Sequence, residues 1–372
     1  MGLISSSFFL GAIMAIIAML PPVFHNFKMG AIPLDDISVE EISIFPAITV
    51  FIPARDEELL LEKKLLNVIS MDYPPSKLRI LVIDSGSTDS TGEIARETLS
   101  SHAGEISWSI ERLETPGKSI AVNRAIGIID TEFFVMTDVD SQCPPDALKI
   151  AASRLVNEPD LGAICGRKIS STKSPLHSYR WRFNRVRIGE SILDSTPIFE
   201  GSFCAFRTSS VSTGIDSSIN ADDTQLALLS RRNNFRSVMD SRLEFIEPKS
   251  NFFREYKRSV RRAQGISRCL FRNRDLSRID GHFGRFFSHN FYFYLIFPWF
   301  LLSSILLVSP AIYDQFLFNQ DSLSSAILVT FLILFYVSVR PVRDFIMGLS
   351  ALIISQLLIL VRADLSVWRP IR

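Results

Sequence analysis

The chain has 372 residues, 47% of them hydrophobic, and a formal net charge of +1 at pH 7. The positive mean hydropathy of +0.22 indicates that part of the apolar content faces lipid instead of a protein core. The four cysteines are scattered and form no C-x-x-C pair, which argues against a zinc site and a disulfide scaffold and fits a reducing compartment. The length allows two or three domains.

Apolar runs near both ends of the chain predict membrane-spanning helices. The first, Leu3–Leu20, carries no charge and approaches the roughly 20 residues that a spanning helix needs. No basic segment precedes it and no clear cleavage site follows it, so we interpret residues 1–24 as an uncleaved anchor and not as a signal peptide. A C-terminal membrane region of two to three spans, residues 291–361, contains three further apolar runs: residues 291–308, 323–339 and 345–361.

The distribution of basic residues predicts the orientation. The segment Arg254–Arg285 and the short loop Arg340–Arg343 are basic, whereas residues 311–322 between the first two C-terminal runs contain no lysine or arginine. Because cytoplasmic loops concentrate positive charge, we expect both basic stretches and the polar domain in the cytoplasm, in an integral protein of the cell membrane. The last run then leaves a basic C-terminus outside, and a re-entrant segment stays open as an alternative there.

The polar part of the chain, assigned to one domain over residues 45–275, alternates short apolar runs with amphipathic stretches. This alternation indicates an α/β domain of Rossmann-like type, with a mostly parallel sheet and helices on both faces. In such sheets ligands bind beyond the carboxyl ends of the strands, so polar residues there should converge. The predicted strands are residues 48–52, 78–83, 106–113 and 133–137, and the predicted helices are residues 57–70, 91–100 and 118–129.

Acidic residues directly follow two of these strands. Asp138 and Asp140 come straight after the strand that ends at Thr137, and in an extended chain both would point to one side. Two hard oxygen ligands suit Mg²⁺ or Mn²⁺ together with a substrate diphosphate. A D-x-D sequence is common in surface turns, but its position after a buried strand favours the metal site. Asp84 comes too early to cap the next helix, which leaves it available for a base or a ribose.

Charged residues later in the domain have two interpretations each. Lys118, behind Gly117, offers positive charge to a diphosphate, although taken alone a solvated lysine is the simpler interpretation. Asp222 and Asp223 precede an expected helix, where they either compensate the helix dipole or supply a general base that deprotonates an attacking hydroxyl.

Two stretches rich in aromatic and basic residues, residues 176–193 and 252–271, are typical of amphipathic helices at a membrane interface. Ordinary packing on the sheet is the alternative for the first. The second carries Arg258, Arg261 and Arg262, which either hold anionic lipid or clamp a leaving pyrophosphate. It lies against a membrane segment, so nucleic-acid binding is not expected.

Seven short motifs follow one another along the domain. They are P-A-R-D-E-E at 53–58, D-S-G-S-T-D at 84–89, G-K at 117–118, D-V-D at 138–140, E-G-S-F-C-A-F-R at 200–207, A-D-D at 221–223 and R-S-V-R-R-A-Q-G at 258–265. Each is weak alone, but all seven in order are specific. Together they resemble the inverting glycosyltransferase family 2, whose membrane members include hyaluronan, cellulose and chitin synthases, ceramide glucosyltransferase and dolichyl-phosphate-mannose synthase. The likeness runs from about residue 48 to 265, with a similar membrane layout.

The resemblance implies a GT-A fold, a UDP-sugar donor and Mg²⁺ or Mn²⁺ as the metal. It places the donor's nucleoside against Ala54, Asp56 and Asp84, with Lys118 near the ribose or the phosphates. Arg261 matches the arginine of the family's Q-x-x-R-W signature, which meets the diphosphate, and we count its neighbours Arg258 and Arg262 with the donor-binding residues.

The same resemblance assigns the metal and the acceptor side. Asp138 and Asp140 match the metal and diphosphate site, with Asp140 the more direct ligand. Asp223 matches the catalytic base. The acceptor is expected against three residues, Gly201, Ser202 and Asp222.

The signature departs from the family pattern in two places. Arg258 stands where glutamine is usual, and Arg262 where tryptophan is usual. In polymer-forming relatives that tryptophan lies by the acceptor at the channel mouth, so its replacement argues against processive synthesis.

The resulting hypothesis is transfer of one sugar, with inversion in a single displacement, to a hydroxyl of a lipid or lipid-linked glycan. A polyprenyl phosphate is the alternative acceptor, because residues 138–142 also match the D-x-D-x-Q stretch of dolichyl-phosphate-mannose synthase. An anionic phosphate needs no base, so Asp223 favours the hydroxyl. Processive polysaccharide synthesis ranks third. A non-catalytic membrane scaffold is not expected, since Asp138, Asp140 and Asp223 are all present.

Overall fold

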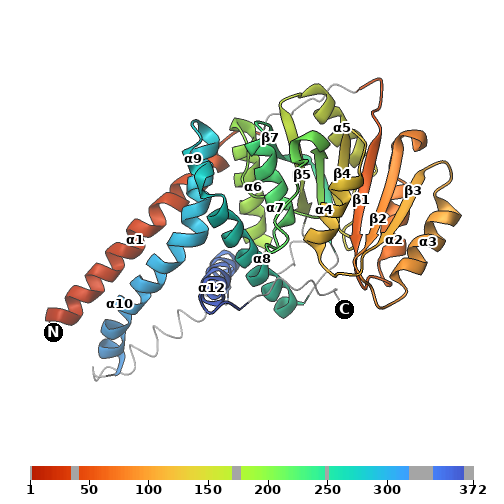
Figure 1. The fold of residues 1–372 in the computed structure, drawn as a ribbon. Helices are drawn as coiled ribbons and strands as arrows, with labels where there is room; N and C mark the ends of the chain where they lie inside the picture. Colours follow the sequence, from red (N-terminus) through yellow and green to blue (C-terminus); the bar gives the residue numbers. More distant parts are fainter. Residues whose placement is uncertain (1, 35–41, 170–176, 248–250, 318–337, 364–372) are drawn as a thin grey trace.

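The computed structural model describes residues 2–34, 42–169, 177–247, 251–317 and 338–363. A seven-stranded sheet with helices on both faces forms its centre. Two long helices, α1 (Gly2–Gly30) and α10 (Phe297–Leu317), lie side by side and extend away from the sheet (Figure 1). The predicted α/β domain with apolar helices outside it is confirmed.

The strands lie in the order β3-β2-β1-β4-β6-β5-β7. β1 to β4 are mutually parallel, β6 is antiparallel to both β4 and β5, and β7 is parallel to β5. The first four strands correspond to the predicted ones, and the other three were not assigned from the sequence. Their bounds are β1 Ile48–Ala54, β2 Leu78–Asp84, β3 Ser107–Arg112, β4 Phe133–Thr137, β5 Leu161–Ile169, β6 Phe203–Arg207 and β7 Arg236–Ile246.

Helices cover the sheet on both faces. α2, α3 and α5 pack on one face, and α4, α6 and α7 on the other. α2 begins at Leu61 and not at Glu57, because the N–H groups of Leu60 and Leu61 both donate to the Glu57 carbonyl in a tight turn. The remaining helices are α2 Leu61–Ile69, α3 Thr91–His102, α4 Lys118–Ile128, α5 Ala147–Asn157, α6 His177–Leu193, α7 Asp222–Arg232, α8 Phe252–Arg272, α9 His282–Phe291 and α12 Arg340–Leu360.

β1 continues through Pro53, which we had expected to end it. The Ala54 carbonyl accepts from Ser85 N–H at 2.8 Å and so points toward β2, which directs the neighbouring Pro53 toward β4. The ladder between β1 and β4 has already ended at the pair Phe51 and Met136. The missing N–H of Pro53 therefore costs no ladder hydrogen bond, and the end of β1 stays open beside β4.

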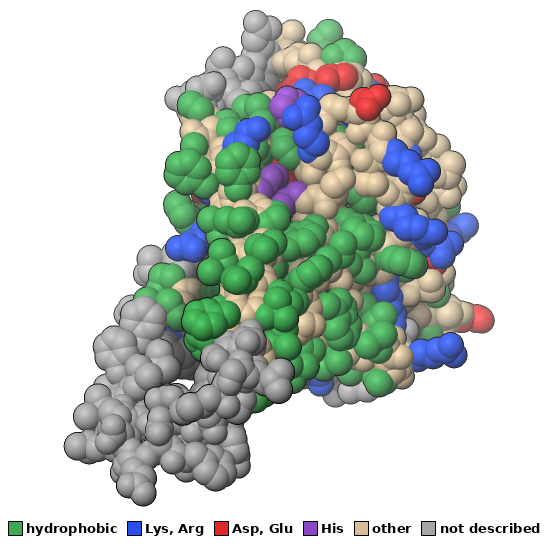
Figure 2. All heavy atoms as spheres, turned by 90° about the vertical axis from the view of Figure 1, so that its left-hand side faces the viewer, with side chains coloured by type: hydrophobic (Ala, Val, Ile, Leu, Met, Phe, Trp, Pro, Cys, Tyr) green, Lys and Arg blue, Asp and Glu red, His purple; other side chains and the backbone are tan. Residues whose placement is uncertain are grey.

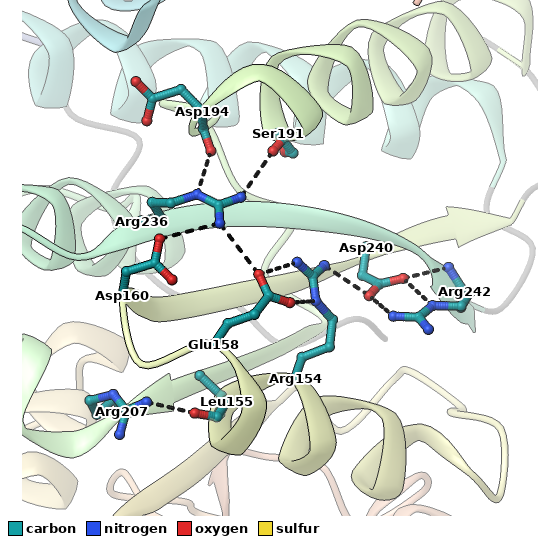
Figure 3. Close-up of polar contacts among 10 residues, drawn as sticks. All are labelled: Arg154, Leu155, Glu158, Asp160, Ser191, Asp194, Arg207, Arg236, Asp240 and Arg242. Atoms are coloured by element: carbon teal, nitrogen blue, oxygen red, sulfur yellow. Dashed lines mark hydrogen bonds and ion pairs between the residues drawn. The ribbon is translucent and has the colours of Figure 1, made fainter. Parts of the chain in front are cut away.

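A buried ion network ties α5 to β7 and to the end of α6 (Figure 3). Arg154 bonds Glu158 at 2.6 Å and Asp240 at 3.0 Å, and both Arg154 and Asp240 are almost wholly buried. Arg242 adds a 2.6 Å contact to Asp240, and Arg236 joins Glu158 to the carbonyls of Ser191 in α6 and of Asp194 just after it. Burial alone would raise the pKa of Asp240, but the hydrogen bonds from Arg242 and the charge of Arg154 hold it below its usual value.

Three described segments are long and apolar enough to cross a membrane: Ser7–Gly30, His282–Pro310 and Arg340–Leu360. The second begins earlier than predicted, because α9 continues through a short π-helical segment, Tyr292–Ile296, into α10. The predicted span 323–339 falls almost wholly outside the described residues. Figure 2 shows hydrophobic side chains gathered over the face where α1 and α10 lie. They include Phe9, Ile13, Ile16, Ile17, Leu20, Phe24 and Leu306.

These helices pack closely on one another and on the sheet domain. A Cβ added at Gly11 would lie 2.7 Å from Val308, and one at Gly189 of α6 would lie 2.5 Å from the carbonyl oxygen of Met29 in α1. Buried Glu190 of α6 bonds His25 of α1 at 2.9 Å. α6, one of the two predicted interfacial helices, thus has its second half enclosed between α1 and the sheet, and its role at a membrane surface stays a prediction.

Candidate functional site

A polar cavity of about 560 Å³ lies beyond the carboxyl ends of β1 and β4. Its wall is built from the loop after β1, the start of α4, the turn after β4, the segment before β6, the start of α7 and one face of α8. Segments far apart in the sequence therefore meet here, as the strand order predicts. The predicted site residues on the wall are Lys118, Asp138, Asp140, Gly201, Ser202, Asp222, Asp223, Arg258, Arg261 and Arg262.

The turn after β4 carries the two predicted metal ligands. Ser141 N–H donates to the Asp138 carbonyl at 3.3 Å, so this segment is a turn, and the extended geometry assumed from the sequence is wrong. Val139 is buried beneath the turn while both carboxylates line the cavity. Lys118 Nζ lies 2.6 Å from Asp138 Oδ1, so this lysine is ion-paired and not simply solvated.

Acidic side chains outnumber basic ones on the wall of the cavity. The acidic residues are Glu57, Asp138, Asp140, Asp222, Asp223 and Glu247, and the basic ones are Arg55, Lys118, Arg258, Arg261 and Arg262. Burial, with the charges of Glu247 and Asp138, raises the pKa of Asp140 to about 6. Burial, with the charges of Asp140 and Asp138, raises the pKa of Glu57 to about 8. These raised pKa values reflect carboxylates that repel one another, and a cation bound among them would relieve that repulsion.

The wall fits a metal that binds together with its substrate. In the described part of the chain, no three His, Cys, Asp or Glu side chains are placed to hold a metal by themselves. Asp138 and Asp140 still offer hard oxygens, and Mg²⁺ is commonly held by one or two carboxylates, water and substrate phosphates. Mn²⁺ accepts the same ligands. The donor set therefore suits a divalent ion that a diphosphate completes.

Asp223 lies at the start of α7 and faces Gly201. Its Oδ1 accepts from Thr224 N–H at 2.7 Å, and its Oδ2 lies 3.7 Å from Arg262. Burial raises the pKa of Asp223, while the charge of Arg262 opposes that rise. A Cβ added at Gly201 would lie 3.0 Å from Asp223 Oδ2, so only glycine leaves this carboxylate its present position. A buried carboxylate with a raised pKa is suited to accept a proton.

Arg262 connects Asp223 to a second buried acid. Its Nη2 lies 2.8 Å from Glu200, which also bonds Arg187 at 2.6 Å. Burial would raise the pKa of Glu200, but Arg262, Arg187 and Arg180 hold it well below its usual value. Glu200 thus pairs with the charge of Arg262, the arginine at the tryptophan position of the Q-x-x-R-W signature.

Asp222 has a different environment from its neighbour. It is buried, and its Oδ1 accepts from Ser119 Oγ in the first turn of α4. Burial raises its pKa, against the charge of Lys118. This contact joins α7 to α4 at the edge of the cavity, so Asp222 holds the wall together as well as lining it.

Three predicted nucleoside contacts do not line this cavity in the described structure: Ala54, Asp56 and Asp84. Asp84 is buried, and its Oδ1 accepts from Ser87 N–H at 2.9 Å. Asp56 has φ of 50° and accepts from Thr88 N–H at 2.7 Å. Both carboxylates therefore order the loop after β2, and their contact with a nucleoside stays a prediction.

The inner face of α8 supplies three arginines in different states. Arg258 bonds Glu247 at 2.8 Å and lies 3.5 Å from Asp140. Arg262 is paired as described above. Arg261 lines the cavity, and no acidic side chain among the described residues forms an ion pair with it. Burial, together with the charge of Arg258, lowers its pKa. Arg261 is the cation best placed to take an anionic ligand.

Sequence reasoning missed three acidic residues of the site. Glu57 and Glu200 belong to two of the seven motifs, next to Asp56 and Gly201. Their positions in these motifs could have identified them as site residues. Glu247 follows β7, a strand we had not assigned, and no local pattern marks it. Lys168 and Arg258 offset the burial of Glu247 and lower its pKa to about 2. It also accepts from Ser202 Oγ at 2.9 Å.

Comparison with known proteins finds the same family along most of the sheet domain. Residues 49–214 match the family model "Glycosyl transferase family 2". The chain is 28% identical over 141 residues to the probable glycosyltransferase YdaM of Bacillus subtilis, covering 37% of this chain and 33% of that protein. It is 27% identical over 123 residues to a beta-monoglucosyldiacylglycerol synthase of Nostoc, covering 33% and 26%. The match thus spans a third or less of these curated relatives.

One solved structure resembles nearly the whole chain. A mannosyltransferase of Pyrobaculum calidifontis, in complex with GDP-Man and Mn²⁺, superposes with a TM-score of 0.81 and 24% identity, covering 97% of this chain and 100% of that one. At this identity the likeness shows the fold, including the helices outside the sheet.

Proposed function

We propose that this chain, whose residues 49–214 match the model of glycosyl transferase family 2, is a member of that family and an inverting, metal-dependent hexosyltransferase of the membrane. It transfers a sugar from a nucleotide-sugar to a hydroxyl of a lipid or lipid-linked glycan. One observation carries the proposal. A single cavity joins the Asp138 and Asp140 turn, Arg261 and the buried carboxylate of Asp223. These are the groups that diphosphate binding and hydroxyl activation require.

The diphosphate of the donor binds between the turn after β4 and α8. Arg261 and Lys118 supply positive charge to the phosphate oxygens, and Asp138, which holds Lys118 at the cavity wall, would also be a ligand of a bound metal. A divalent ion on Asp140 and Asp138 supplies further charge for the leaving diphosphate. Each of these groups stabilises the charge that develops as the sugar departs.

The acceptor side of the cavity is formed by Gly201, Ser202 and the start of α7. Asp223 takes the proton from the acceptor hydroxyl while the hydroxyl oxygen attacks the anomeric carbon from the face opposite the leaving group. The C–O bond to the diphosphate breaks in the same step, and the anomeric configuration inverts. The charge of Arg262 opposes the rise that burial causes in the pKa of Asp223 and so favours the ionised carboxylate that accepts the proton.

The nucleotide is the least defined part of the donor. The motif resemblance favours UDP, whereas the structural neighbour from Pyrobaculum calidifontis was solved with GDP-Man. A lipid acceptor is supported by the three candidate spans and by the relative named as a glycolipid synthase. The basic start of α8 beside these spans supports a cytoplasmic active site at the cell membrane, in contact with membrane lipids.

The test is nucleotide release by the purified full-length protein. UDP- and GDP-sugars would be supplied with Mg²⁺, Mn²⁺ or a chelator, with and without a membrane-lipid extract. We expect metal-dependent release of one nucleotide, stimulated by lipid, with label entering one discrete lipid product. A long water-soluble polymer would show a processive synthase. Release that does not need Asp223 would show a phosphate acceptor, and no release with any donor would refute the proposal.

A further inference from the structure

A fully buried lysine lies directly behind the turn that carries Asp138 and Asp140. Lys64 belongs to α2, does not line the cavity and has no exposed surface. Its helical neighbours Leu61 and Leu65 are core residues. Burying an ammonium group is costly unless each of its N–H groups finds an acceptor. A lysine at this position in an apolar helix face therefore needs a specific explanation.

The partners of Lys64 are not the usual ones for a buried lysine. Its Nζ donates to Thr137 Oγ1 at 2.7 Å, to Ser141 O at 3.0 Å and to Ser141 Oγ at 3.2 Å. Cys143 Sγ lies 3.7 Å away as well, so the three N–H groups of the ammonium have three oxygens and one sulfur as acceptors. None of the acidic residues that the structure describes forms an ion pair with it. The ammonium therefore holds the Ser141 carbonyl and the hydroxyls of Thr137 and Ser141, and it does not neutralise an acid among the described residues.

Thr137 and Ser141 are the two ends of the turn. Thr137 is the last residue of β4, and Ser141 closes the turn onto the Asp138 carbonyl. The Lys64 ammonium therefore forms hydrogen bonds to both ends of the turn that contains Asp138 and Asp140. This contact fixes the spacing and direction of the turn.

The same hydroxyls reach the acceptor side of the cavity. Thr137 Oγ1 donates to the Ser202 carbonyl at 2.8 Å, and Ser141 Oγ lies 3.0 Å from that carbonyl. Ser202 follows Gly201, the residue that faces Asp223. Lys64 thus belongs to a hydrogen-bond network that joins the turn of Asp138 and Asp140 to the segment of Gly201 and Ser202.

We propose that Lys64 is a positioning residue, whose ammonium clamps the Asp138 and Asp140 turn against the Ser202 segment and so sets the geometry in which metal and diphosphate bind. The proposal rests on the proposed function. Groups that orient metal-binding side chains from behind affect affinity or activity by roughly 10- to 100-fold when removed. We therefore expect a defect in metal and nucleotide binding that exceeds any loss of stability.

The test compares Lys64→Met with two matched variants. Methionine keeps the length and apolar contacts of the side chain and removes the ammonium. Lys63→Met removes a lysine from the exposed side of the same helix, and Leu65→Ala weakens the same core at a side chain that has no polar group to bond the turn. α2 keeps a second hold on the loop, because Asn67 exchanges two 3.0 Å hydrogen bonds with Cys143, so Lys64→Met is expected to fold.

The readouts are Mn²⁺ binding in the presence of UDP or GDP, measured by electron paramagnetic resonance, and thermal unfolding in the same detergent. We expect Lys64→Met to weaken Mn²⁺ and nucleotide binding by about 10-fold or more, with Lys63→Met at the wild-type value. Leu65→Ala should lower the melting temperature and keep Mn²⁺ affinity. If folded Lys64→Met binds Mn²⁺ as the wild type does, the inference is wrong. If the wild type itself binds neither Mn²⁺ nor nucleotide, the proposed function fails first.

Discussion

Adding one methyl group at Gly201 should slow transfer without weakening donor binding. In Gly201→Ala the new Cβ would lie 3.0 Å from Asp223 Oδ2, where ordinary contact begins at 3.4 Å. The carboxylate must therefore retreat by about 0.4 Å. If a misplacement of about 1 Å costs roughly 100-fold and the logarithm of the rate scales with distance, this shift costs about 6-fold in kcat, or ~1 kcal/mol.

The assay is nucleotide release under saturating donor and metal, with lipid extract as acceptor. Gly127→Ala is the matched control, because Gly127 lies in α4 and a Cβ there meets nothing within 4 Å. We expect the control to keep the wild-type kcat and to gain slightly in stability, as alanine does over glycine in helices. The KM for the donor should be unchanged in both variants.

Two results would refute this reasoning. A wild-type kcat in Gly201→Ala would show that the position of Asp223 does not limit transfer. A raised donor KM with unchanged kcat would instead place Gly201 against the donor, and the acceptor would have to be sought elsewhere in the cavity.

Four further substitutions test separate parts of the site and the fold. Asp223→Asn should keep donor binding and reduce transfer at least 100-fold, since the base is lost, and transfer by this variant at the wild-type rate would exclude the base assignment. Because burial raises the pKa of Asp223, the kcat/KM of the wild type should fall as the pH drops through that pKa. Asp140→Ala should remove metal-stimulated nucleotide binding in titration calorimetry, and retained stimulation would exclude it as a ligand. Arg261→Ala should weaken UDP or GDP binding about 10-fold, whereas unchanged affinity would reduce this arginine to a lipid contact. Asp240→Asn should lower the free energy of unfolding by about 3 kcal/mol near neutral pH, because Arg154 loses a buried partner. The folded-state pKa of Asp240 is depressed, so the wild type is more stable than the variant above the unfolded-state pKa of Asp240, and this difference should vanish on acidification. A difference in unfolding free energy that stays constant down to pH 2 would contradict this.

The predictable part of the fold lies where local pattern and burial agree. β1, β2 and β4 are mostly apolar because helices cover them on both faces, and such runs can be recognised in the sequence. β6 is a short segment whose antiparallel course follows from a long connection through α6, and β7 mixes arginine and aspartate with its apolar residues. β6 is apolar but only five residues long, and charged residues interrupt the apolar pattern of β7, so neither strand was assigned from the sequence.

The site divides in the same way. The strand-end rule brought Asp138 and Asp140 to the sheet edge, and the motif order added Asp223 and Arg261, all of which line one cavity. The partners of these residues could not be predicted, because an ion pair such as that of Arg262 with Glu200 depends on how α8 lies across the sheet. Lys64 was unpredictable for the same reason, since its acceptors are on a loop far away in sequence.

The contact of α1 with α6 has a practical consequence for preparing a soluble form of this protein. Shortening the chain to its sheet domain would remove Met29 from Gly189 and take away one hydrogen-bond partner of buried Glu190, while leaving an apolar face uncovered. Contacts between α1 and the sheet domain would therefore be lost in such a form. The family match begins at residue 49, but a shortened protein should not begin there, because it would lack α1.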